Sequence, residues 1–145
     1  MPIIHEPAFL AWEQTVPASV SEDSVWRFHT YRVALYLVDL AEHDAAQIRR
    51  HRPTSPLADQ LHRSVTSISA NIAEGLGRAT ATDRSRFFGH AIGSLREGTS
   101  WYRAARSFLP PGALEARLEQ LAELRRLLLG AIRWLSRKPA KARLF

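Results

Sequence analysis

The sequence of 145 residues contains no cysteine and only two lysines. Without cysteine, the chain can have no disulfide framework, thiolate zinc site, iron–sulfur cluster or cysteine nucleophile. No apolar run approaches the roughly 20 residues that a membrane-spanning helix requires. Residues 1–13 lack the basic start of a secretory signal. We therefore expect a cytoplasmic protein with no membrane contact, and one domain large enough to bury its own core.

Positive charge in this chain is carried almost entirely by arginine. There are 18 arginines, and together with the two lysines they exceed the 14 acidic residues to give a net charge of +6. Residues 1–24 contribute −4, so the remainder of the chain carries about +10. Such a surplus favours an anionic partner such as nucleic acid, and the alternative is a basic surface without a specific partner.

Four segments show helical periodicity, and none shows the alternation of a half-buried strand. We expect an all-α fold, an antiparallel up-down-up-down four-helix bundle over residues 24–138, since short turns make successive helices antiparallel. Residues 1–23 form an acidic N-terminal extension and residues 139–145 a basic tail. The four expected helices are 25–50 with Ser24 as N-cap, 56–74 after Ser55 and before Gly75-Leu76-Gly77, 82–109, and 114–135.

The fourth helix is more apolar than one core stripe requires. A helix that is apolar most of the way round is buried most of the way round, which predicts a ring-shaped homo-oligomer. The alternative is that apolar residues of the N-terminal extension fold back over this surface, and both can hold together. The expected oligomer interface is Trp26, Trp101, Leu127, Leu129, Ile132 and Trp134.

Several stretches of the middle of the chain resemble a known family. They are Q-L-H-R-S-V at 60–65, S-I-S-A-N-I-A-E-G-L-G-R at 67–78, F-F at 87–88 and A-I-G-S-L-R-E at 91–97. Together they resemble the four-helix-bundle proteins encoded in 23S ribosomal RNA intervening sequences, over roughly residues 26–136. The sequence departs from the usual pattern in its acidic extension, in Ser69 where proline is common, and in Gly98-Thr99-Ser100.

This resemblance implies small helical bundles that assemble as rings, typically pentamers. The family includes the accessory variability determinants of diversity-generating retroelements, which partner a reverse transcriptase and bind nucleic acid through a basic surface. No catalytic residue is implied by the resemblance.

The most specific stretch of the resemblance places polar residues along one helical face. Glu74 and Arg78 have the spacing of an ion pair, and Gly93 and Gly98 are expected to allow close helix approach. We interpret these residues as a structural polar seam that fixes helix register, with a binding seam as the alternative. The seam residues are Asn71, Glu74, Gly75, Gly77, Arg78, Gly93, Ser94 and Glu97.

Catalytic alternatives find little support. None of the nine glutamates has a histidine three residues later, as a di-iron bundle would need. The six histidines show no metal-ligand spacing, and the serines have no histidine–carboxylate relay. We therefore expect no enzyme activity, no metal and no cofactor.

In an antiparallel bundle, the turns after the first and third helices lie at one end, and the remaining turn and the chain end lie at the other. We expect a non-enzymatic protein that binds RNA or DNA backbones at these ends. The alternative is a protein adaptor, for example an accessory subunit of a reverse transcriptase, whose arginines face an acidic partner. The expected nucleic-acid-binding residues are Arg49, Arg50, Arg52, Arg103 and Arg106 at one end, and Arg78, Arg84, Arg86, Lys138, Lys141 and Arg143 at the other.

Overall fold

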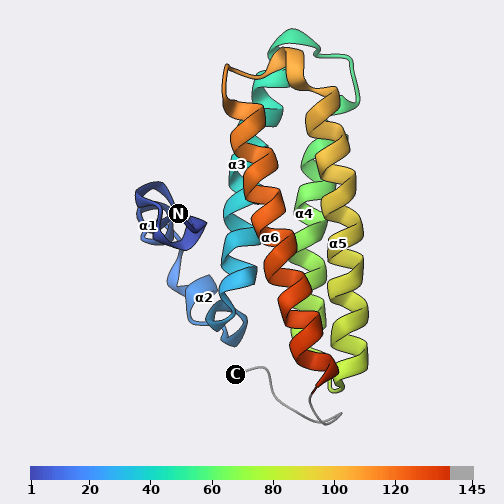
Figure 1. Cartoon of the computed structure of the whole chain (residues 1–145). Coiled ribbons are helices and arrows are strands. Elements are labelled where there is room, and N and C mark those ends of the chain that lie inside the picture. Colours follow the sequence, from blue (N-terminus) through green and yellow to red (C-terminus); the bar gives the residue numbers. More distant parts are fainter. Residues whose placement is uncertain (138–145) are drawn as a thin grey trace.

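A computed structural model describes residues 1–137 of the chain (Figure 1). The described part contains α-helices and short 3-10 helices and no strand, which confirms the all-α prediction. The short elements at the N-terminus are η1 (Ile3–His5), α1 (Pro7–Glu13), α2 (Ala18–Ser21) and η2 (Ser24–Arg27). The long elements are α3 (His29–His51), α4 (Leu57–Leu76), α5 (Ala81–Ala104) and α6 (Ala113–Ser136), with η3 (Arg106–Phe108) between the last two.

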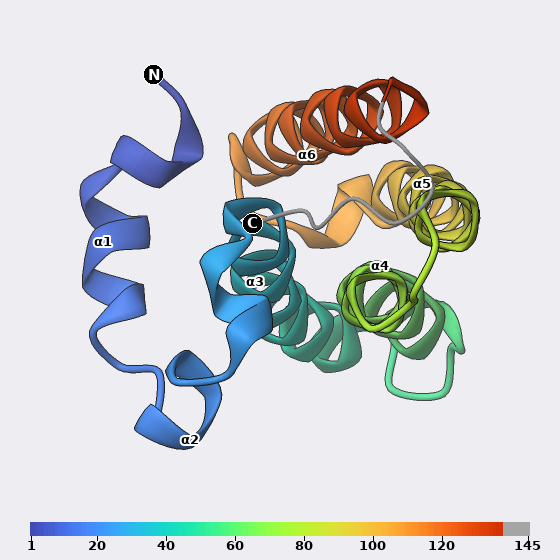
Figure 2. The same ribbon diagram turned by 90° about the horizontal axis from the view of Figure 1, so that it is seen from below.

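The four long helices lie side by side and alternate in direction along the chain (Figures 1 and 2). Helix α3 packs on α4, α4 on α5, α5 on α6, and α6 returns to α3. We call α3–α6 the helical body. Its centre is filled by aliphatic and aromatic side chains of all four helices, among them Ile48, Leu61, Ile68, Phe88, Leu124 and Leu128, each fully buried.

The first long helix begins later than predicted. Ser24 does not cap it, because the carboxylate of Asp23 accepts the backbone N–H of Val25 at 3.0 Å and caps the short η2 instead. Phe28 then takes an extended conformation (φ −86°, ψ 100°), so the α-helix can begin only at His29. Local capping, which hydrophobic periodicity does not report, sets this boundary.

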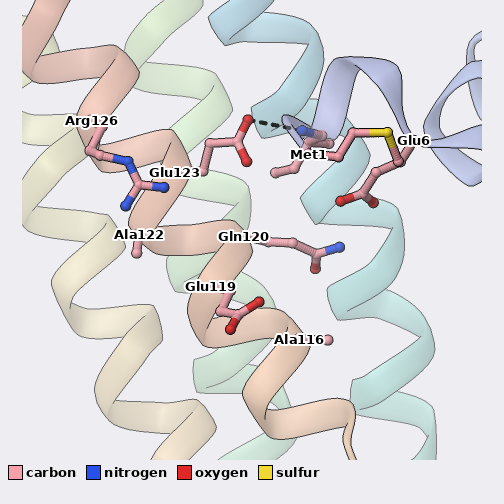
Figure 3. A pocket seen from close by; sticks show the side chains of 9 residues that line it. Met1, Glu6, Ala116, Glu119, Gln120, Ala122, Glu123 and Arg126 are labelled. Carbon is pink, nitrogen blue, oxygen red and sulfur yellow. Dashed lines mark hydrogen bonds between the residues drawn. The ribbon is translucent and has the colours of Figure 1, made fainter.

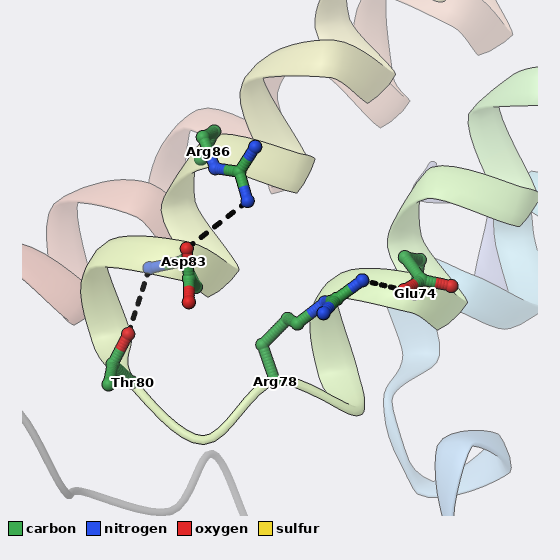
Figure 4. A network of polar contacts seen from close by, with 5 residues as sticks. All are labelled: Glu74, Arg78, Thr80, Asp83 and Arg86. Carbon is green, nitrogen blue, oxygen red and sulfur yellow. Dashed lines mark hydrogen bonds and ion pairs between the residues drawn. The ribbon is translucent and has the colours of Figure 1, made fainter.

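The other helix starts follow capping and turn chemistry. The Ser55 hydroxyl accepts the backbone N–H of Leu57 at 3.3 Å, and α4 begins at Leu57, one residue after the predicted start. The Thr80 hydroxyl accepts the backbone N–H of Asp83 at 3.1 Å at the start of α5 (Figure 4). Gly112 precedes α6 with φ +80°, a left-handed conformation that favours glycine. Helix α5 ends at Ala104, five residues before the predicted end, because the chain tightens there into η3.

The two glycines near the end of α4 differ in their role. Gly77 follows α4 with φ −76°, so it does not take the left-handed conformation that glycine often adopts after a helix. Gly75 instead lies within α4, where a Cβ atom would lie 3.0 Å from Phe87 Cβ and 3.0 Å from Phe88 Cε1. Its missing side chain lets α4 and α5 approach.

The two glycines of α5 differ from each other. A Cβ atom on Gly98 would lie 3.3 Å from Ser64 and Val65, as expected for a close contact between α4 and α5. Within residues 1–137, no atom of another helix lies within 4 Å of a Cβ atom placed on Gly93, so its predicted role in helix approach is wrong.

Residues 1–27, which we call the N-terminal segment, fold back on the flank of α3 and α6 (Figure 2). Ile3 and Phe9 are each only 1% exposed. The Phe9 ring meets Tyr36 of α3 edge-on at 5.3 Å, and the backbone N–H of Ile3 donates to Glu123 of α6 at 2.9 Å. The segment therefore covers part of the apolar surface of the helical body, as in the alternative considered from the sequence.

Candidate nucleic-acid interface

The end of α3 and the short helix η3 meet at one end of the helical body. The guanidinium of Arg52 lies over the ring of Phe108, 5.5 Å from its centre, and the His51 ring stacks on the same phenylalanine at 6.2 Å. Arg106 donates to the backbone carbonyl of Arg103 at 3.0 Å. Arginines from two separate turns are thus brought together here, as the antiparallel arrangement predicts.

Most of the arginines at this end keep their charge uncompensated. Arg49 pairs with Asp59 at 2.6 Å, and its hydrogen bond and charge lower the pKa of that carboxyl. The others are exposed, and none has an acidic side chain of residues 1–137 within ion-pair distance. These four are Arg50, Arg52, Arg103 and Arg106. We call them, with Phe108, the basic end.

The turn between α4 and α5 places arginines differently. Arg78 and Arg86 lie over the Phe87 ring, at 4.6 and 5.0 Å from its centre. Arg78 also pairs with Glu74, as its spacing predicts, and Arg86 pairs with Asp83 at 3.2 Å (Figure 4). Because acidic neighbours partly cancel both charges, this turn offers a phosphate less positive potential than the basic end.

The remaining arginine of that turn stabilises the backbone. The Nε of Arg84 donates to the carbonyl oxygen of Arg78 at 2.7 Å, which ties the turn to the first part of α5. The other residues predicted for this end, Lys138, Lys141 and Arg143, lie outside the described residues.

The polar seam predicted between the second and third helices is present in part. The hydroxyl oxygens of Ser67 on α4 and Ser94 on α5 are 2.9 Å apart. The side-chain amide of Asn71 donates to the Ser67 carbonyl at 2.8 Å and to its hydroxyl at 3.1 Å. Glu97 lies apart from this group and accepts the indole N–H of Trp101 at 3.3 Å. The Asn71–Ser67–Ser94 contacts favour the structural interpretation of the seam.

A buried polar cluster, which was not predicted from the sequence, joins α3, α5 and α6. Asp44 is 2% exposed and accepts the hydroxyl of Tyr102 at 2.8 Å. Arg117 donates to the same carboxylate through Nε at 2.7 Å and through Nη2 at 3.3 Å. One feature of the sequence pointed to this cluster. Arg117 stands four residues before the core residue Leu121, so both lie on the same face of the helix.

The pKa values of Tyr102 and Arg117 are both raised in this cluster. Burial, and then the charge and hydrogen bond of Asp44, raise the pKa of Tyr102 well above its usual value. Burial acts to lower the pKa of Arg117, but its bonds to Asp44 outweigh that and raise it. The carboxylate's oxygens are both used by these partners, so the cluster holds the helices and presents no free group to a ligand.

The residues expected at an oligomer interface do not form one bare patch. Five of the six are half-buried against the core of this same chain. The sixth is Trp26, whose ring centre lies 6.0 Å from that of Trp12 in the N-terminal segment. The Arg32 guanidinium lies over the Trp26 ring, 5.9 Å from its centre. Among residues 1–137, the most exposed large apolar side chains are instead Met1 and Leu10, at 79% and 47%.

An acidic hollow of about 510 Å³ lies between the N-terminal segment and α6 (Figure 3). Glu6 faces Glu119 and Glu123 across it, and Arg126 lies at one edge. The Glu123 carboxylate is already used by the backbone N–H of Ile3. Within residues 1–137, no three histidine or acidic side chains are arranged to hold a metal ion, and no helix is long and apolar enough to cross a membrane.

Comparison with known proteins identifies the family. The sequence profile of the 23S rRNA-intervening sequence proteins matches residues 40–130, more than half of the chain. No curated protein matches the sequence. The fold is similar to the crystal structure, at 1.70 Å resolution, of a protein of unknown function from the S23 ribosomal protein family of Bacteroides thetaiotaomicron. The two are 20% identical with a TM-score of 0.67, over 72% of this chain and 98% of the other. The chain therefore belongs to the family of 23S rRNA-intervening sequence proteins.

Proposed function

We propose that this protein is a non-enzymatic, cytoplasmic RNA- or DNA-binding protein that holds phosphate backbones with its arginines. In this proposal the helical body acts as an up-down-up-down four-helix bundle and self-associates into a ring, a pentamer by resemblance to the family. The protein needs no cofactor for this role.

The observation that supports the proposal is the composition of the basic end. Four exposed arginines gather there without acidic partners in the described part of the chain, beside the half-buried ring of Phe108. The planar guanidinium binds phosphate oxygens in pairs, and an aromatic ring beside cations suits an unpaired base. Binding of this kind depends on charge and little on sequence.

Self-association would strengthen such a surface. A cyclic arrangement repeats the basic end once per subunit and adds the potentials of all copies. Of the expected interface residues, Leu127 and Trp134 line a groove of about 380 Å³ between the start of α3 and α6, which could receive a neighbouring chain. Light scattering at micromolar concentration tests the ring, and a monomer would contradict it.

The direct test is binding of a fluorescent single-stranded RNA, followed by anisotropy at low salt. Changing Arg52 and Arg106 together to glutamine should weaken binding about tenfold, since two phosphate contacts are lost. The matched control changes Arg126 and Arg133 of α6 to glutamine, which removes the same charge from a different surface. Equal weakening in both variants would contradict a localised interface, and no binding by the unmodified protein at low salt would contradict the function.

A further inference from the structure

A second basic surface lies along the side of the helical body, in a groove of about 470 Å³ between α5 and α6. Its apolar lining includes Leu95, which is 3% exposed, and the half-buried Leu118. The hydroxyl of Thr99, which also lines it, is already bonded to the Leu95 carbonyl at 2.9 Å. The groove therefore offers a ligand an apolar floor with few free polar groups.

Three arginines edge this floor, namely Arg96 and Arg103 from α5 and Arg125 from α6. All three are exposed, and no acidic side chain of residues 1–137 lies within ion-pair distance of them. An apolar floor between uncompensated cations suits a ligand that is both apolar and anionic. A phosphate backbone matches only the cations, and the described residues that line the groove include no aromatic ring on which a base could stack.

On the other side of α6, the helical body already binds a segment that is both apolar and acidic. There the N-terminal segment, with its net charge of −3, inserts Ile3 and Phe9 against the helical body. Its Glu13 pairs with Arg32 of α3 at 2.7 Å. The chain thus covers the α3–α6 side of the helical body with an acidic amphipathic segment that contains a helix. The groove on the α5 side combines an apolar floor and arginines in the same way, and no described part of the chain covers it.

We propose that the α5–α6 groove is a docking site for an acidic amphipathic helix of a partner protein. Arg96 and Arg103 are seven residues apart, so they recur about 10 Å apart along α5. Acidic residues seven apart on a bound helix have the same repeat and can face both arginines, while the apolar stripe between them lies on Leu95 and Leu118. This site goes beyond the proposed nucleic-acid binding and does not depend on it.

The probe is a fluorescent synthetic helix of about 18 residues with a leucine stripe flanked by glutamates at seven-residue spacing. The full chain should bind it saturably in an anisotropy titration. Changing Arg96 and Arg125 together to glutamate should weaken binding at least about tenfold, because two attractions become repulsions. The matched control, Arg126→Glu with Arg133→Glu, should change affinity less than about twofold. Arg103 stays unchanged because it belongs to both basic surfaces.

Three further measurements decide between this occupant and others. A peptide with glutamine in place of its leucines should lose most of its binding, and undiminished binding would overturn the proposal. Single-stranded RNA should bind the groove variant as well as it binds the unmodified protein. If that variant loses RNA binding as strongly as peptide binding, the groove is a nucleic-acid surface instead. Light scattering should give both proteins the same mass, and a change would show that a second copy occupies the groove.

Discussion

The two flanks of α6 differ in charge and in cover. Toward α3, the helix lies beside the N-terminal segment, and Glu119 and Glu123 face an acidic hollow (Figure 3). Toward α5, Arg125 faces the arginines of an open groove. The difference shows that the acidic part of the chain is used to cover its own apolar surface. The positive charge is concentrated where no described segment covers the helices.

The largest expected effect on stability comes from Arg117, whose bonds to Asp44 fix the rotation of α6 about its axis. Changing Arg117 to methionine should lower the free energy of unfolding by about 3–5 kcal/mol, because it leaves the buried Asp44 carboxylate without its cation. Urea denaturation followed by circular dichroism measures this. Arg126→Met, on the exposed face of the same helix, should change stability by less than about 0.5 kcal/mol. Similar losses in both variants would show that the buried cluster does not hold α6.

The next effect compares the covered flank with the open one. Phe9→Ala should cost about 3 kcal/mol, since the ring is almost completely buried against Tyr36. Leu118→Ala should cost only about 1 kcal/mol, because Leu118 is only partly buried in the open groove. Chemical denaturation of the two variants gives the difference. A larger loss for Leu118→Ala would mean that the α5 side is covered within the chain.

Alkaline pH should lower the free energy of unfolding through Tyr102, which bonds to the buried Asp44. Folding raises the pKa of Tyr102, so the folded protein keeps this proton above about pH 10 while the unfolded chain releases it. The stabilisation is complete below that pH and falls by about 1.4 kcal/mol for each further pH unit. The pH dependence of urea unfolding measures this slope. Tyr102→Phe should reduce it, and an unchanged slope would contradict the assignment.

The smallest expected effect contrasts single arginines on the two flanks. Arg32→Gln should cost about 1 kcal/mol, because it leaves Glu13, whose side chain is 17% exposed, without its partner. Arg96→Gln, at the edge of the open groove, should cost less than about 0.5 kcal/mol. Thermal unfolding of the two variants side by side measures this contrast. Equal stability of both would show that the Glu13 pair does not fasten the N-terminal segment.

Much of the fold could be predicted because helical periodicity and turn residues report local structure. The apolar stripes predict four long helices, and proline and glycine mark most of their ends. The start of α3 could not be predicted, because it depends on the Asp23 cap and the extended Phe28. Whether the N-terminal segment or a second subunit covers the apolar surface was also open, since composition favours both.

The candidate site could be predicted where it follows from helix direction alone. Antiparallel helices bring Arg52 and Arg106 to one end whatever their exact rotation. The Asp44 cluster and the α5–α6 groove depend instead on how each helix is rotated about its axis. Periodicity gives the apolar face of α6, but it does not say that Arg125 lies beside α5 or that Arg117 reaches Asp44.

The most direct test of the proposed function is the salt dependence of RNA binding. Plotted as the logarithm of the binding constant against that of the salt concentration, the unmodified protein should give a steep negative slope. The slope should become shallower by about two when Arg52 and Arg106 are changed to glutamine, since each phosphate contact contributes about one. It should not change in the Arg126→Gln and Arg133→Gln control. No binding at low salt, or the same slope in all three proteins, would contradict the account.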